Sequence, residues 1–256
     1  MARGTLKLGA NVSNVAFSKD GSELVVSDQQ PRARIFTTEP LRLSEEIPFA
    51  APVERAIFTG AEGRHVAVAG AVPQAQVAAR ALIKLLPAGD APVTSLAVAA
   101  DGTRFFAGNA KGRIVAWKLA DLQPERAWDA HTDAVSELAI TPNGQSLISG
   151  GRDKAIKIWN TADGMVVRTI PQSAAVASVH LSSDGLRVAS TGEDGSVSVW
   201  EVASGLPLQT IAGHMPGPGT AVRWQADGVT LVTAARDQKM RVSKTSIVRK
   251  IGRAHV

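Results

Sequence analysis

One pattern recurs six times along this 256-residue chain: an alternation of apolar residues ends in a turn glycine, and a second apolar run follows it. The segment VSELAITPNG, which begins at Val135, is an example. The turn glycines lie 42, 39, 42, 41 and 43 residues apart, at Gly21, Gly63, Gly102, Gly144, Gly185 and Gly228. Because glycine accepts the positive φ of a tight hairpin turn, each one predicts a hairpin. A fixed repeat of this kind constrains the fold more than composition does.

A third run in most units ends at a fixed distance from the turn. The residue 15 positions beyond the turn glycine is Phe36, Trp117, Trp159, Trp200 or Ser243. A short fourth run follows, for example MVVRTI from Met165. Each unit is therefore predicted to form four short antiparallel strands, too few to bury both faces alone. We predict an all-β fold, a β-propeller of about six four-stranded blades, in a ring that the ragged ends suggest is incomplete.

The repeats divide the chain into one predicted domain, residues 1–249. Its units lie near 12–52, 53–92, 93–134, 135–175, 176–218 and 219–249. The second unit departs from the pattern, because residues 73–86 read PQAQVAARALIKLL. That composition suits a short helix as well as degenerate third and fourth strands, and we favour the strands.

Both ends of the chain suggest a fragment. Thr5–Leu8 resembles a fourth strand that arrives from an earlier blade. Residues 251–256 read IGRAHV, a peptide that the start of a common sequencing adapter encodes, and Lys250 fits the preceding AAG codon. We therefore predict that residues 250–256 are a non-native tail. The first ten residues contain no apolar signal-peptide core, and this does not fix the compartment.

Composition argues against several classes of protein. The absence of Cys excludes disulfides, thiolate zinc sites and a cysteine nucleophile. The 28 basic and 23 acidic residues are interleaved, so the net charge of +5 does not favour a nucleic-acid partner. Apolar runs such as Leu96–Ala100 are far shorter than the roughly 18 residues that a membrane-spanning helix needs.

The units resemble WD40 repeats, most clearly in His131–Asn160 and Gly185–Glu201. In that family a His, a Ser or Thr, a turn Asp and the Trp form a buried hydrogen-bonded set. The resemblance implies the full set in the fourth unit and partial sets in the fifth and sixth: His131, Ser149, Asp153 and Trp159; Ser190, Asp194 and Trp200; His214, Thr233 and Asp237. The third unit has Trp117 but Lys111 in place of the Asp. We assign these residues structural rather than catalytic roles, because partial copies recur at the same offsets.

The resemblance also implies an interaction face, formed by loops at one end of the blades. By position, it contains the residue after each first-strand start and the residue before each turn Asp. These are Ser13, Glu54, Thr94, Ser136, Ala177, Thr220, Arg152, Glu193 and Arg236. The set is polar and mixed in charge, without the Trp or Tyr anchors of a typical binding hot spot.

No constellation for catalysis or metal binding stands out. His65, His131, His180 and His214 lie in different units, and His180 in a first strand is expected to be packed against a neighbouring blade. The chain lacks a phosphate-binding glycine motif. We expect no metal and no cofactor.

The resemblance implies a non-catalytic scaffold that binds a protein or peptide partner, within a longer multidomain chain of bacterial type. The alternative is a propeller enzyme with a small-molecule or metal site in its central channel, similar to lactonase or quinoprotein propellers. Such a site needs converging carboxylates and histidines. In the sequence, the first-strand positions that would face the channel are mainly Ser, Thr, Ala and Val. We therefore favour the scaffold.

Overall fold

A computed structural model describes residues 12–18, 20–49, 51–59, 65–70, 74–79, 82–211, 213–214, 217–237 and 239–245. The predictions for Thr5–Leu8 and for the tail 250–256 lie outside these ranges. The described chain forms five four-stranded sheets and a sixth sheet of three strands, and the strands of each sheet are paired in chain order. All the pairs are antiparallel, so each sheet is a meander built from consecutive hairpins.

The strands of the first three sheets are β1 (Asn14–Phe17), β2 (Glu23–Ser27), β3 (Arg32–Thr38), β4 (Leu41–Pro48), β5 (Val53–Thr59), β6 (His65–Gly70), β7 (Gln74–Ala79), β8 (Leu82–Pro87), β9 (Val93–Val98), β10 (Arg104–Asn109), β11 (Arg113–Lys118) and β12 (Pro124–Asp129). Those of the last three are β13 (Val135–Ile140), β14 (Ser146–Gly151), β15 (Ala155–Asn160), β16 (Val166–Pro171), β17 (Val176–Leu181), β18 (Arg187–Gly192), β19 (Val197–Glu201), β20 (Pro207–Ile211), β21 (Gly219–Trp224), β22 (Thr230–Ala235) and β23 (Met240–Lys244).

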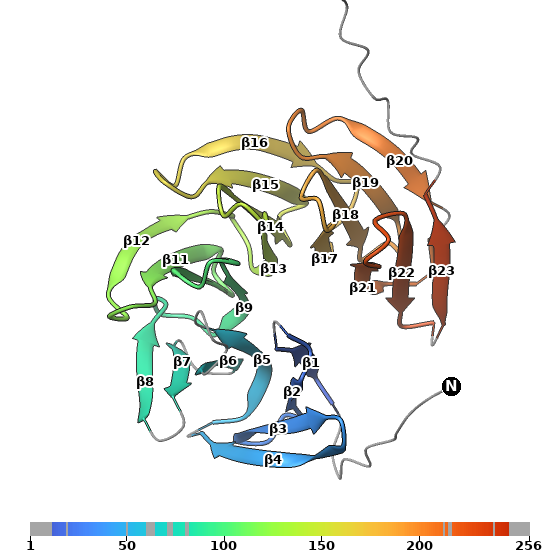
Figure 1. The fold of residues 1–256 in the computed structure, drawn as a ribbon. Helices are drawn as coiled ribbons and strands as arrows, with labels where there is room; N and C mark the ends of the chain where they lie inside the picture. Colours follow the sequence, from blue (N-terminus) through green and yellow to red (C-terminus); the bar gives the residue numbers. More distant parts are fainter. Residues whose placement is uncertain are drawn as a thin grey trace, which may run out of the picture.

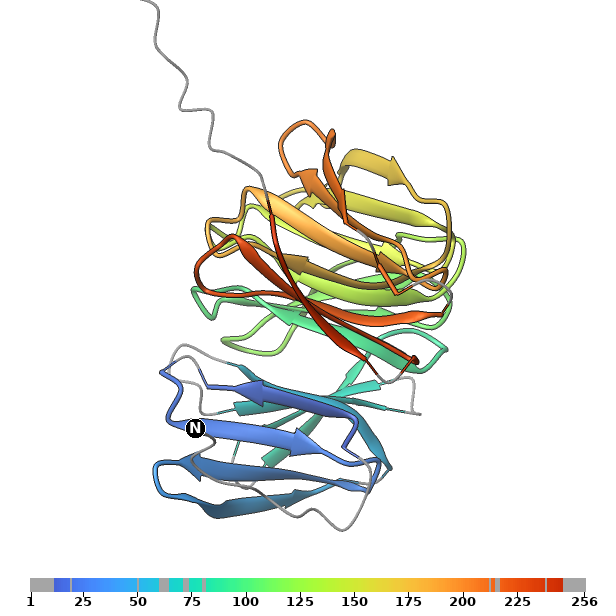
Figure 2. The same cartoon turned by 90° about the vertical axis from the view of Figure 1, so that its right-hand side faces the viewer.

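The sheets follow one another around an arc, with the first strand of each sheet innermost and the last outermost (Figure 1). The first and sixth sheets lie on either side of an opening, which faces the viewer in Figure 2. This arrangement confirms the predicted propeller of four-stranded blades in five sheets. The sixth sheet has three strands among the described residues, which end at Thr245.

Local sequence explains the hairpins. Five of the predicted turn glycines have φ between 65° and 74°, the left-handed region that favours glycine. The sixth, Gly63, lies outside the described residues. The ambiguous segment near residues 73–86 contains strands β7 and β8 rather than a helix. Pairing with β6 decided this, because the helix-compatible composition is a weaker preference than completing the sheet.

The hydrophobic core lies between neighbouring sheets. One cluster joins Phe106 and Ile114 of the third sheet to Leu147 and Trp159 of the fourth. The preceding cluster packs Trp117 against Leu86 and other residues of the second sheet. The second to fifth sheets therefore bury both faces against the previous and the next sheet, whereas the first and sixth sheets each pack against one neighbour.

A polar contact also connects neighbouring inner strands at four of the boundaries between sheets. A side chain in the third place of one unit accepts the backbone N–H of the fourth place in the next unit. The pairs are Asn14 Oδ1 with Ala56 N at 3.2 Å, Ser95 Oγ with Leu138 N at 2.7 Å, Glu137 Oε2 with Val179 N at 3.0 Å, and Ser178 Oγ with Val222 N at 3.3 Å. Arg55 and Ala221 hold this place in the second and sixth units, and neither side chain can accept such a bond.

Candidate interaction site at the mouth of the channel

A β-bulge recurs at the start of the inner strands β5, β9, β13, β17 and β21. At each bulge the ladder skips one residue of the inner strand, and the skipped residues are Glu54, Thr94, Ser136, Ala177 and Thr220. A bulge bends its strand and re-aims the unpaired side chain. The bulges therefore release five of the predicted interaction residues from the regular alternation of the sheet.

These residues surround two adjoining hollows, which we call the channel mouth. The first hollow has a volume of about 370 Å³ and is lined by Ser13, Asn14, Gln29, Glu54, Arg55, Glu137, Ser178, Thr220, Ala221 and Arg223. The second has a volume of about 420 Å³ and is lined by Thr94, Ala134, Val135, Ser136, Arg152, Val176, Ala177, Glu193, Pro218, Gly219, Thr220 and Arg236. Thr220 borders both hollows. All nine residues of the predicted interaction face line one hollow or the other.

The charges at the second hollow are partly neutralised. Arg152 Nη2 lies 2.6 Å from Glu193 Oε1, and both side chains are about half exposed. The side chain of Arg236 is exposed and has no hydrogen-bond or ion-pair partner among the described residues. This hollow therefore presents one paired and one unpaired arginine.

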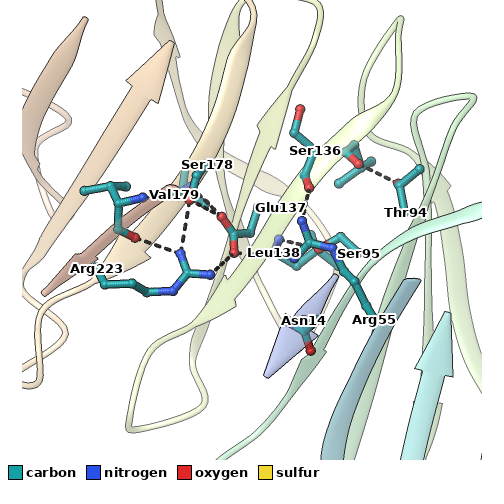
Figure 3. Close-up of polar contacts among 12 residues, drawn as sticks. Asn14, Arg55, Thr94, Ser95, Ser136, Glu137, Leu138, Ser178, Val179 and Arg223 are labelled. Carbon is teal, nitrogen blue, oxygen red and sulfur yellow. Dashed lines mark hydrogen bonds and ion pairs between the residues drawn. The ribbon is translucent and has the colours of Figure 1, made fainter. Parts of the chain in front are cut away.

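Sequence reasoning missed a group of charged residues inside the first hollow. Glu137 is buried, and Arg55 and Arg223 approach its carboxylate from opposite sides (Figure 3). Arg223 Nη2 donates to Glu137 Oε1 at 2.9 Å, and Arg55 Nη1 lies 3.6 Å from the same oxygen. We call these three residues the channel triad.

Glu137 has no carboxylate oxygen to spare. Its Oε2 accepts hydrogen bonds from the Ser178 hydroxyl and from Val179 N, while its Oε1 faces the two arginines. Burial alone would raise the pKa of Glu137, but Arg223, Arg55 and the Ser178 hydroxyl outweigh it and hold the pKa below its usual value. Glu137 is therefore an ionised acceptor fixed in the channel wall, and it is poorly suited to act as a general base.

The triad corrects the description of the channel as lined mainly by Ser, Thr, Ala and Val. Arg55 and Glu137 hold the third place of their units, where the other units have Asn14, Ser95, Ser178 and Ala221. A long charged residue at a repeat position that is otherwise small was the available signal. Neither charged residue stands out within its own unit, because the residue that it contacts belongs to another unit.

His180 is a packed residue that bonds to the next blade. Its Nδ1 lies 3.1 Å from Trp224 N, so the ring accepts this hydrogen bond in its neutral form. Burial, supplemented by the nearby charge of Arg223, lowers the pKa of His180 to about 4. It is neutral at pH 7 and is committed to the join between the fifth and sixth sheets.

The structure brings together the four polar residues of the fourth unit. His131 Nδ1 lies 2.8 Å from Asp153 Oδ1, and His131 Nε2 lies 2.7 Å from Ser149 Oγ. Trp159 Nε1 donates to the same hydroxyl at 2.8 Å. Burial lowers the pKa of His131 despite the opposing effect of Asp153, so the ring is neutral at pH 7, with its proton on Nδ1 facing the carboxylate. Ser149 then donates to His131 and accepts from Trp159.

The fifth and sixth units hold modified versions of this set. Trp200 Nε1 donates to Ser190 Oγ at 3.1 Å, and Gln172 occupies the place of the missing His, with its Oε1 3.4 Å from Ser190 Oγ. Asp194 accepts from Ser173 Oγ at 2.9 Å. In the sixth unit His214 Nε2 lies 2.9 Å from Thr233 Oγ1, and its Nδ1 lies 3.1 Å from Asp237 Oδ2. Gln172 and Ser173 could not be recognised as substitutes from the repeat pattern.

Among the described residues, no three His, Cys, Asp or Glu side chains gather closely enough to hold a metal ion. The same part of the chain contains no helix with the length and hydropathy to cross a membrane.

Comparison with known proteins agrees with this geometry. The family model described as WD domain, G-beta repeat matches residues 122–160 and 164–201. The crystal structure of the Cps50 (Swd1) β-propeller domain from Myceliophteria thermophila aligns with a TM-score of 0.83, covering 92% of this chain and 84% of that one. The chain is a WD40-repeat β-propeller. At 16% sequence identity, the Cps50 likeness shows the fold of this WD40 propeller and nothing of its partners.

Two curated relatives of the WD40 propeller are nearer in sequence than Cps50, but each aligns over only part of the chain. The target of rapamycin complex subunit wat1 of Schizosaccharomyces pombe is 24% identical over 162 residues, which is 60% of this chain and 52% of that protein. The LST8 homolog of Dictyostelium discoideum is 22% identical over 159 residues, which is 59% of this chain and 52% of that protein. The chain thus spans about half the length of these relatives.

Proposed function

We propose that this WD40 propeller is a non-catalytic platform that binds a protein or peptide partner at the channel mouth. The observation that carries the proposal is the repeated bulge, which aims Glu54, Thr94, Ser136, Ala177 and Thr220 at one pair of hollows. Bulges are frequent next to functional sites, where they re-aim a side chain. The name of wat1 describes a subunit of a complex, and this supports a protein partner.

The channel triad supports a platform rather than an enzyme. A catalytic channel needs carboxylates or histidines with lone pairs available to a substrate. Glu137 already faces four donor groups, and His180 Nδ1 accepts from Trp224 N. These side chains hold neighbouring blades together. They therefore give no support to the alternative of a propeller enzyme. The wider setting, a longer multidomain chain of bacterial type, stays a prediction.

Paired variants at the two ends of the strands test the platform. Thr220→Arg adds a long cation to an exposed bulge residue that borders both hollows. Leu186→Arg makes a matched change in the exposed turn between β17 and β18, at the opposite end of the strands. We expect wild-type and Leu186→Arg chains to capture the same partner from an extract of the source organism, and Thr220→Arg to lose it. Equal capture by both variants would place the partner elsewhere, and no capture by any chain would contradict the platform.

A further inference from the structure

The channel triad contains more positive charge than it neutralises. Two guanidinium groups share the single negative charge of Glu137, and both face Oε1 of its carboxylate. Arg223 forms the shorter contact, at 2.9 Å. The Arg55 contact, at 3.6 Å, is longer than a good hydrogen bond. Arginine remains protonated in proteins, so the surplus charge persists at all physiological pH values.

Both arginines also retain donors that no described group accepts. A guanidinium has five N–H groups. Arg223 uses Nη1 for Ser178 Oγ and Val222 O, and Nη2 for Glu137. Arg55 Nη2 donates to Ser136 O at 3.4 Å. The Nε–H of each residue has no partner in the described part of the chain, and the two side chains are 31% and 45% exposed. A ligand that enters the first hollow can therefore reach them.

The chemistry of these donors selects an anion. The oxygens of Glu137 are already occupied, so the triad offers no acceptor to a cationic side chain. The forked donors of arginine match the two oxygens of a carboxylate. The first hollow, at about 370 Å³, lies at the lower end of the range of ligand pockets, roughly 300 to 1,000 Å³. Glu54 at its rim is exposed and opposes an anion, which provides an internal test.

We propose that the first hollow binds an acidic residue of the partner, whose carboxylate accepts hydrogen bonds from the donors of Arg55 and Arg223 that Glu137 leaves free. The inference rests on the proposed platform function and specifies the chemistry that its first hollow recognises.

The test uses fluorescein-labelled hexaglutamate, hexaglutamine and hexalysine peptides with the whole chain, and fluorescence anisotropy as the readout. We expect hexaglutamate to bind, and Arg55→Gln to weaken it about tenfold, the loss typical of a charge-assisted hydrogen bond. Arg168→Gln is the control, because it removes an equal charge from exposed Arg168 on the outer strand β16. Glu54→Gln should tighten binding about twofold, as expected for a rim charge.

Three results would overturn the assignment. They are no binding of hexaglutamate, equal weakening by Arg55→Gln and Arg168→Gln, or equal binding of hexaglutamine. If Arg55→Gln does not fold, as judged by circular dichroism, Glu54→Gln decides, and unchanged or weaker binding would contradict the site.

The outcome also separates this inference from the platform itself. A partner that is lost with Thr220→Arg while hexaglutamate fails to bind would leave the platform standing without an acidic ligand. Hexaglutamate binding through Arg55, with partner capture insensitive to Thr220→Arg, would leave the anion site standing without the platform.

Discussion

The third and fourth sheets bury the same large side chain in different polar surroundings. Trp117 and Trp159 hold equivalent places, and both are buried. Trp159 Nε1 donates to Ser149 Oγ, whereas Trp117 Nε1 is buried with no hydrogen-bond partner among the described residues. The reason is visible in the sequence: Ala107 stands ten residues before Trp117, where Ser149 stands before Trp159.

The two sheets also differ in how the turn is held. In the fourth sheet the ring of His131 approaches so closely that a Cβ at Gly151 would lie 2.2 Å from its Nδ1. In the third sheet Gly89 stands in place of the His, and the side chain of Asn109 holds the turn instead. Its Nδ2 donates to Ala88 O at 2.9 Å, and its Oδ1 accepts from Lys111 N at 2.9 Å. Apolar packing is therefore sufficient to form a blade, and the hydrogen-bonded set adds stability to blades that possess it.

Removing the central hydroxyl of the fourth sheet should have the largest effect. Ser149→Ala leaves Trp159 Nε1 and His131 Nε2 buried without partners, at a cost of about 1 to 3 kcal/mol for each group. We expect the free energy of unfolding to fall by about 2 to 6 kcal/mol in urea titrations. Ser146→Ala, in the same strand, is the control, because no described group bonds to its hydroxyl. Similar losses of stability in the two variants would show that the hydrogen-bonded set does not stabilise the fold.

The turn Asp should have the next largest effect. Asp153→Ala removes the acceptor of His131 Nδ1 and of Thr132 N, at an expected cost of about 1 to 3 kcal/mol. Asp163→Ala, which removes only the exposed acceptor of Met165 N, should cost less. Equal denaturation midpoints for the two variants would contradict the role assigned to Asp153.

Lowering the pH tests the difference between the third and fourth sheets in another way, because the third sheet has no histidine at the position equivalent to His131. The pKa of His131 lies below 6.5 in the folded chain, so the unfolded chain takes up the proton first as the pH falls. Stability is then full above pH 6.5 and falls below it, by at most about 1.4 kcal/mol per pH unit for each such histidine. His180, with a pKa of about 4, contributes in the same direction.

Unfolding free energies at pH 7.5 and 5.5, above the range where carboxylates titrate, measure this dependence. His131→Asn should show a smaller loss on acidification than the wild-type chain. An identical pH dependence would mean that His131 titrates normally.

The smallest predicted effect is a gain. Ala107→Ser places a hydroxyl where the fourth sheet has Ser149, within the environment that surrounds Trp117 Nε1. We expect a stabilisation of about 0.5 to 1 kcal/mol, the net value of one buried hydrogen bond. Thermal unfolding of Ala107→Ser against the wild-type chain measures it. A loss of stability would show that this core cannot accept the added oxygen.

Much of this molecule could be predicted from short-range pattern. The turn glycines, the alternating runs and the offset of the Trp residues predicted the hairpins and the blades, because strand pairing within a blade depends on residues close in the chain. The resemblance to WD40 repeats also implied the set of His131, Ser149, Asp153 and Trp159, which recurs in part from unit to unit. The strands at residues 74–87 were ambiguous by composition, and pairing with β6 decided them.

The channel triad was decided by the tertiary structure. Arg55 and Arg223 lie in the second and sixth units, and their carboxylate partner lies in the fourth, 86 residues before Arg223. No local preference links these positions, because their side chains meet only when the inner strands converge around one axis. The sequence by itself determined the blades, through contacts between near neighbours in the chain. The curvature of the ring determined which charges from distant blades face one another in a space sheltered from water.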